Sequence, residues 1–173
     1  MNNIEQISKE FQTGIDMMWK AHEEIGHVWK LPNQLVCVMY AATECTEVLN
    51  SLTEVVDNQG HYRNNPKDRN TKEEIGDTIM MLGRFFMSLD TKPDFDWIGT
   101  YDNIPDNNYL DIVLRIAEVL RNISTFIMEY EYDYIQFLEM AIYLLFTLLD
   151  EGEYIRLLEK KLNKYRTKIL GTV

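Results

Sequence analysis

Apolar positions recur every three or four residues along most of this chain, whereas the alternation typical of strands is almost absent. The first apolar stripe consists of Ile4, Ile7, Phe11, Ile15 and Met18. This stripe predicts a helix over residues 3–25 that ends near Gly26, since glycine commonly follows the last turn of a helix.

The same periodicity continues to the end of the chain. It predicts further helices over residues 33–56, 71–89, 108–129, 133–149 and 153–169. Thr71 is the expected N-cap of the third helix, because Glu74 follows it at the spacing of a capping box. Short polar connections separate the last three helices, so these helices are expected to pack as antiparallel neighbours.

Two longer polar segments interrupt the helical pattern. Residues 57–70 are rich in Asn and contain Gly60 and Pro66, and residues 90–107 contain two prolines and a glycine. Both segments are predicted to be loops. The chain of 173 residues is therefore expected to form one all-α domain spanning residues 1–173, an antiparallel bundle of about five to six helices.

Composition and charge exclude several classes of function. Apolar residues make up 46% of the chain, and no apolar run approaches the roughly 20 residues that a membrane span requires. The N-terminus lacks the basic start and apolar core of a secretory signal, and Cys37 and Cys45 are placed too far apart on one helix to pair, so a cytoplasmic protein is expected. A net charge of −11 argues against nucleic-acid binding.

Two pairs of acidic residues stand in otherwise apolar helical segments. Glu44 and Glu47 form the first pair, and Glu74 and Asp77 form the second. Because each pair has i,i+3 spacing, both of its carboxylates emerge from one helix face. Acidic pairs are common on solvated helices, but two pairs with apolar flanks are more specific.

The two acidic helices are joined by a loop and can therefore run antiparallel, which would bring both pairs to one level of the bundle. Four carboxylates at a shared interior repel one another and require a counter-ion. Oxygen ligands of this kind suit Mg²⁺, or Mn²⁺ as a substitute, with open positions left for water and phosphate. The sequence thus predicts a metal site at Glu44, Glu47, Glu74 and Asp77.

The acidic pattern, ExxE followed after a loop by ExxD within EEIGDTIMML, resembles the all-α nucleoside triphosphate pyrophosphohydrolases of the MazG-like superfamily. This superfamily includes the dimeric dUTPases, the dCTP pyrophosphatases and the phosphoribosyl-ATP pyrophosphatases. The resemblance covers about residues 30–90. It implies a Mg²⁺-dependent hydrolase that converts a (d)NTP to a nucleoside monophosphate and pyrophosphate, with Glu47 orienting the attacking water, and a homodimer or homotetramer.

Further residues are candidates for contacts to the substrate. Gln34 precedes the first acidic helix as in the superfamily, and Asn50 extends the first motif as in dimeric dUTPases. By the same resemblance, Lys160, Asn163 and Arg166 match a C-terminal element that contacts phosphate in some relatives. The nearest cations to the acidic pairs along the chain are Arg63, Lys67, Arg69 and Lys72.

Alternative functions remain open from the sequence. The loop between the acidic pairs lacks the Lys/Trp-rich sequence associated with dimeric dUTPases, which leaves a dUTPase or dUDPase as an alternative and the base undetermined. A helical regulator that binds a nucleotide or a protein without turnover is a second alternative. Glu24 and His27 form only one of the two ExxH motifs of a di-iron site. Aromatic candidates for a base pocket are Trp29, Trp97, Tyr101 and Tyr109.

Overall fold

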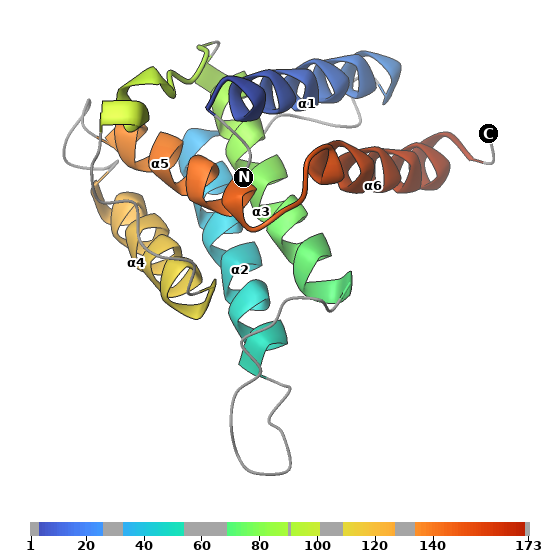
Figure 1. The fold of residues 1–173 in the computed structure, drawn as a ribbon. Helices are drawn as coiled ribbons and strands as arrows, with labels where there is room; N and C mark the ends of the chain where they lie inside the picture. Colours follow the sequence, from blue (N-terminus) through green and yellow to red (C-terminus); the bar gives the residue numbers. More distant parts are fainter. Residues whose placement is uncertain are drawn as a thin grey trace.

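The computed structural model describes residues 4–25, 33–53, 69–89, 91–100, 109–126 and 134–171, and these residues form six α-helices and one short 3-10 helix (Figure 1). The elements are α1 (Ile4–Ile25), α2 (Gln34–Thr53), α3 (Arg69–Leu89), η2 (Asp96–Thr100), α4 (Tyr109–Phe126), α5 (Tyr134–Thr147) and α6 (Glu153–Leu170). The predicted all-α fold is confirmed. The predicted ends at residues 54–56 and 127–129 lie outside the described residues, as do the connecting segments 54–68 and 101–108.

Helices α2 and α3 pack along each other as an antiparallel hairpin (Figure 1). Ser51 near the end of α2 shares a hydrogen bond of 2.8 Å with Thr71 at the start of α3. At the opposite end of the hairpin, Cys37 lies within electrostatic reach of Arg84. This register places the middle of α2, around Glu44, opposite the middle of α3, around Asp77.

The predicted N-cap of α3 is wrong. Thr71 lies inside the first turn of α3, which begins at Arg69, and its side chain is buried against α2. Its hydroxyl bonds to Ser51 instead of to the orphan amides at the helix start. The sequence pattern of a capping box does not distinguish these two roles, because the contact that decides between them lies 20 residues away.

Helix α5 supplies much of the core. Its sequence, YIQFLEMAIYLLFT, is apolar on almost every side, which is typical of a helix surrounded by others. It contacts α1, α3 and α4. Phe11 of α1 makes edge-to-face contacts with Phe86 of α3, Phe95 before η2 and Phe146 of α5, at centroid distances of 6.0, 5.9 and 6.2 Å. This aromatic cluster joins three helices in the interior.

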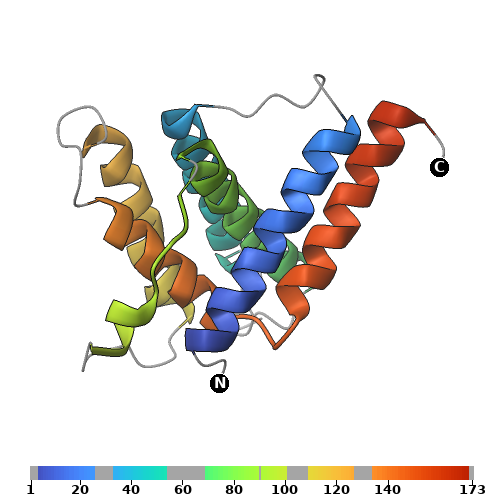
Figure 2. The same ribbon diagram turned by 90° about the horizontal axis from the view of Figure 1, so that it is seen from above.

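Helix α6 does not fold back along α5 as the short connection predicted. It turns away after Gly152, which has a left-handed φ of 70°, and lies beside α1 with both helices running in the same direction (Figure 2). The buried stripe of α6, which includes Tyr154, Leu158 and Leu162, explains this arrangement, because the stripe packs into the core that α1 and α3 provide. Helices α4 and α5 are neighbours as expected, and both views show them running in roughly opposite directions (Figures 1 and 2).

The segment before α4, predicted to be a loop, contains the 3-10 helix η2. Glu139 of α5 is only 4% exposed and holds this segment, because its two oxygens accept hydrogen bonds from the Asp94 amide at 2.8 Å and the Trp97 indole at 2.7 Å. Burial raises the pKa of Glu139. Trp97, an aromatic candidate for a base pocket, is therefore engaged in anchoring η2 to α5.

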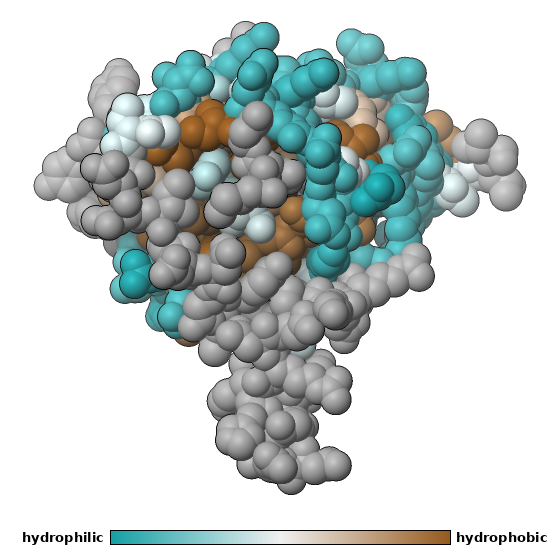
Figure 3. All heavy atoms as spheres, in the orientation of Figure 1, coloured by the Kyte–Doolittle hydropathy of each residue, from teal (hydrophilic) through white to brown (hydrophobic). Residues whose placement is uncertain are grey.

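On the face shown in Figure 3, hydrophilic and hydrophobic residues occupy different areas of the surface. Hydrophilic residues cover α1 and α6, whereas hydrophobic residues reach the surface in the centre, where α5 lies in Figure 1. Within the described residues, no helix combines the length and apolar character required to cross a membrane.

Candidate metal centre

Three of the four predicted acidic residues converge between α2 and α3. Glu44, Glu74 and Asp77 each place one carboxylate oxygen within 4.8 Å of the others, and all three side chains are partly buried. The antiparallel register explains the convergence, since it sets Glu44 of α2 opposite Asp77 of α3. The i,i+3 spacing then directs both acids of α3 toward α2. Such a group of hard oxygen ligands fits Mg²⁺ or Mn²⁺.

Glu47, the fourth predicted acid, lies at the solvent edge of this cluster. Its side chain is exposed, and it does not belong to the three-residue group. Glu47 nevertheless reaches Glu74, because a hydrogen bond between their carboxyl groups contributes to the raised pKa of Glu74. A carboxylate at the open edge of a metal site can contact a water molecule that is coordinated to the metal ion.

The pKa values of the three acids indicate that nearby positive charge balances their negative charge only in part. Burial and the charges of Asp77, Glu47 and Glu44 raise the pKa of Glu74 to about 7. Burial and the charges of Asp77 and Glu47 also raise the pKa of Glu44, which Lys161 lowers. Burial raises the pKa of Asp77, although its hydrogen bond to Lys161 acts in the opposite direction. A divalent cation would relieve all three.

Among the described residues, Lys161 of α6 is a cation that contacts the cluster, and sequence analysis missed it. Its Nζ forms an ion pair with an Asp77 oxygen, and the side chains are 28% and 16% exposed. The helical pattern contains a signal for it, because Lys161 follows buried Tyr154 by seven residues and buried Leu158 by three. A lysine on the buried face of a helix requires an acidic partner.

Two cations predicted from the sequence, Lys72 and Lys160, bind acids outside the three-residue group. Lys72 points to the start of α6, where it pairs with Glu153 at 2.9 Å and Asp150 at 3.2 Å. Lys160 pairs with Glu73 at 2.6 Å. These two lysines thus connect α3 to α6 around the acidic cluster rather than within it.

Arg166 and Asn163 lie further along α6. The Arg166 guanidinium donates to Asn163 at 3.0 Å and to Glu24 of α1 at 2.6 Å. Glu24, half of the ExxH motif, is thereby part of the contact between α1 and α6, and His27 lies outside the described residues. In this arrangement the C-terminal Lys/Asn/Arg element contributes to helix packing.

The remaining predicted contacts are only partly placed. Gln34 is the first residue of α2, ten positions before Glu44, which is roughly 15 Å along a helix. Asn50 is exposed one turn after Glu47. The structural description does not extend to Arg63, Lys67 or the Arg69 side chain. It also omits Trp29, Tyr101 and the Tyr109 side chain.

A buried polar group lies close to Asp77 on the side of α1. The Tyr154 side chain is fully buried, and its hydroxyl has no hydrogen-bond partner among the described residues. Burial, together with the charges of Glu10 and Asp77, raises the pKa of this hydroxyl. Glu10 itself is 8% exposed and accepts a hydrogen bond of 3.2 Å from the Gly152 amide at the start of α6. The packing of α1 against α6 therefore borders on the acidic cluster.

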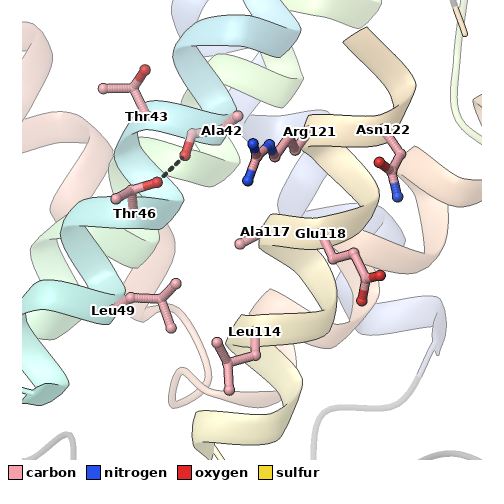
Figure 4. Close-up of a pocket in the computed structure, with 9 residues that line it drawn as sticks. All are labelled: Ala42, Thr43, Thr46, Leu49, Leu114, Ala117, Glu118, Arg121 and Asn122. Atoms are coloured by element: carbon pink, nitrogen blue, oxygen red, sulfur yellow. Dashed lines mark hydrogen bonds between the residues drawn. The ribbon is translucent and has the colours of Figure 1, made fainter. Parts of the chain in front are cut away.

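A separate cavity of about 800 Å³ opens between α2 and α4. Figure 4 shows Arg121 extending into the space between the helices and Glu118 turned away from α2, with Leu49, Leu114 and Ala117 forming an apolar wall. The Thr46 hydroxyl donates to the Ala42 carbonyl at 2.9 Å, so its hydrogen is already engaged. Since none of the four acids Glu44, Glu47, Glu74 and Asp77 lines this cavity, we do not assign it to the metal centre.

The raised pKa of Glu74 predicts that the metal-free protein becomes less stable as pH rises. Its pKa goes from an ordinary 4.5 to about 7 on folding, so the folded state binds more protons between these values. The stabilisation is complete below pH 4.5 and is lost as the pH passes about 7. After a discount for solvent screening, we expect a loss of about 1–2 kcal/mol in unfolding free energy.

Urea unfolding in EDTA at pH 5 and pH 8 measures this effect. Glu74→Gln removes the titrating group and should show a smaller loss between the two pH values, whereas Glu159→Gln, at an exposed position of α6, should behave like the unsubstituted protein. An equal pH dependence in all three proteins would contradict the predicted shift.

Comparisons of this chain with protein-family models, with curated protein sequences and with solved structures found no match in any of the three. The likeness to the MazG-like superfamily therefore depends on the acidic motifs and their spacing.

Proposed function

We propose that this protein is a Mg²⁺-dependent nucleoside triphosphate pyrophosphohydrolase that cleaves a (d)NTP between the α and β phosphates. The supporting observation is the convergence of Glu44, Glu74 and Asp77 from two helices. The ExxE and ExxD motifs that supply these residues are those of the superfamily that the sequence resembles. The expected products are a nucleoside monophosphate and pyrophosphate.

Charge determines how such a site must operate. Among the described residues, the acids of the cluster outnumber Lys161, the basic residue in contact with Asp77, so these residues alone repel a polyanionic triphosphate. Glu44, Glu74 and Asp77 would hold the cation, which supplies charge neutralisation on the phosphates and lowers the pKa of a coordinated water. Both substrate binding and the chemical step should therefore depend on the metal.

The other residues have distinct roles in this proposal. Glu47 at the solvent edge orients the attacking water and accepts its proton. The water oxygen bonds to the α-phosphorus, the bond from this phosphorus to the bridging oxygen breaks, and pyrophosphate leaves with that oxygen. No covalent intermediate with the protein is required.

A product assay tests the proposal directly. A panel of NTPs and dNTPs, including dUTP, dCTP and oxidised or methylated bases, is incubated with Mg²⁺ and separately with EDTA. We expect release of pyrophosphate and the monophosphate from one or a few members with Mg²⁺ only. In ¹⁸O-labelled water the label should enter the monophosphate, because attack is at the α-phosphorus.

Each other outcome has a defined meaning. Hydrolysis of dUTP and dUDP alone would assign the enzyme to the dUTPase type. Label in pyrophosphate, or products of diphosphate and inorganic phosphate, would contradict attack at the α-phosphorus. Absence of turnover across the panel, in folded protein that binds Mn²⁺, would contradict the hydrolase and favour a nucleotide-binding regulator.

A further inference from the structure

Lys161 and a divalent cation compete for the same carboxylate. The Lys161 ammonium is paired with Asp77, and its charge also acts on Glu44. Two of the three acids in the three-residue group, Asp77 and Glu44, therefore interact electrostatically with Lys161. A cation held by the same oxygens would come within a few ångströms of the ammonium, where like charges repel strongly at partly buried positions.

The surrounding contacts make Lys161 the lysine best placed to move when a divalent cation binds. Lys72 and Lys160 are bound to acids outside the three-residue group, and Arg166 is bound to Glu24. The backbone of α6 is fixed by its buried Tyr154 and Leu158, so a response requires only rotation of the flexible lysine side chain. Once it is released from Asp77, the Lys161 ammonium can remain beside the divalent cation. The phosphate oxygens of a substrate would lie at this place.

The buried hydroxyl next to this site is a second, independent observation. Tyr154 is nine-tenths or more buried, lies within electrostatic reach of Asp77 and has no partner for its hydroxyl among the described residues. An unpaired buried polar group is costly, and such groups concentrate at functional sites. This unpaired hydroxyl within electrostatic reach of Asp77 therefore supports a functional role for the corner where Lys161 and Asp77 meet.

We propose that Lys161 is a displaceable internal counter-ion: the divalent cation replaces its ammonium at Asp77, and the released ammonium then binds the phosphates of the substrate. This inference rests on the proposed function, because it requires the acidic group to bind a metal. It assigns to Lys161 two opposite effects, competition with the metal and attraction of the phosphates. A lysine that served only to join α6 to α3 would have neither effect.

Metal binding to the full chain tests the first effect. Mn²⁺ affinity is measured by electron paramagnetic resonance with unsubstituted protein, Lys161→Met and Lys164→Met, the last removing an exposed charge one turn along the same helix. We expect Lys161→Met to tighten Mn²⁺ binding about tenfold and Lys164→Met to change it less than about twofold, because interactions between exposed charges are weak. Lys161→Arg keeps the charge and should remain within about threefold of the unsubstituted protein.

Phosphate binding tests the second effect. With the site saturated by Mn²⁺, calorimetric titration with inorganic pyrophosphate should show binding about tenfold weaker in Lys161→Met than in Lys164→Met, since one charge-assisted contact is lost. Lys161→Gln serves as a second neutral variant, with circular dichroism to verify that each variant is folded.

The outcomes separate the two proposals. Folded Lys161→Met that binds Mn²⁺ no more tightly than the unsubstituted protein would overturn the competition. Equal pyrophosphate affinity in Lys161→Met and Lys164→Met would overturn the role in phosphate binding. Failure of the unsubstituted protein to bind Mn²⁺ would instead overturn the proposed function and this inference with it.

Discussion

Replacement of Glu44 by Gln is expected to reduce metal-dependent hydrolysis strongly while making the metal-free protein slightly more stable. Glu44 is one of three acids whose oxygens lie within 4.8 Å of each other, and removal of its charge deprives the cation of a ligand. We expect turnover to fall by about 100- to 1,000-fold, in line with the loss of a group that positions transition-state charge. Asp77→Asn should give a loss of the same order.

The stability effect has the opposite sign because the charge of Glu44 is unfavourable in the folded state. Burial, Asp77 and Glu47 raise its pKa, so ionisation at neutral pH opposes folding. A neutral amide of the same shape removes this repulsion, and we expect a gain of about 0.5–1 kcal/mol in unfolding free energy in EDTA.

Turnover with Mg²⁺ and urea unfolding in EDTA are the two measurements. Glu159→Gln, which removes an equal charge from an exposed position of α6, should change neither by much. Loss of turnover together with loss of stability would indicate simple misfolding. Full turnover in both Glu44→Gln and Asp77→Asn would refute the assignment of the metal centre.

The helices could be predicted from the sequence because periodicity is a local property. The stripe from Ile4 to Met18 defined α1, and the acidic pairs could be placed on α2 and α3 because i,i+3 spacing fixes a helix face. The convergence of Glu44 with Glu74 and Asp77 followed from the expectation that two helices joined by a loop run antiparallel.

Contacts between distant segments could not be predicted in the same way. The sequence pattern of Thr71 fitted an N-cap, but the decisive hydrogen bond comes from Ser51 of another helix. The direction of α6 depends on how its buried stripe meets α1 and α3, whereas connection length alone suggested α5 as the neighbour. The same long-range packing brings Lys161, rather than the adjacent Lys160, to Asp77.

Gly14→Ala is expected to destabilise the protein even though alanine is the better helix former. Gly14 lies in α1, and a Cβ added there would stand 2.6 Å from Tyr154 Cε1 and 2.9 Å from its hydroxyl oxygen. Tyr154 cannot move aside easily, because it is fully buried and packs edge to face against Phe146 at 5.2 Å. Overpacking of this kind should outweigh the helix-propensity gain of about 1 kcal/mol and leave a net loss of about 2 kcal/mol.

Gly83→Ala is the matched control for this prediction. Its Cβ would also come within 2.6 Å of a buried side chain, but the neighbour is the terminal methyl of Met18. A flexible thioether can change rotamer to make room, so we expect a change of less than about 1 kcal/mol. Thermal unfolding measures both variants, with an expected decrease in Tm of about 4–8 °C for Gly14→Ala.

The comparison of the two glycines tests how α6 is held against α1. A Gly14→Ala protein as stable as Gly83→Ala would contradict the close packing of Tyr154 on α1. If Gly14→Ala is destabilised as expected, its effect should extend to the metal centre, because Tyr154 and Lys161 belong to the same helix and Asp77 lies near both. A displaced α6 weakens the pair between Lys161 and Asp77, so Mn²⁺ should bind Gly14→Ala more tightly than Gly83→Ala at a temperature where both are folded.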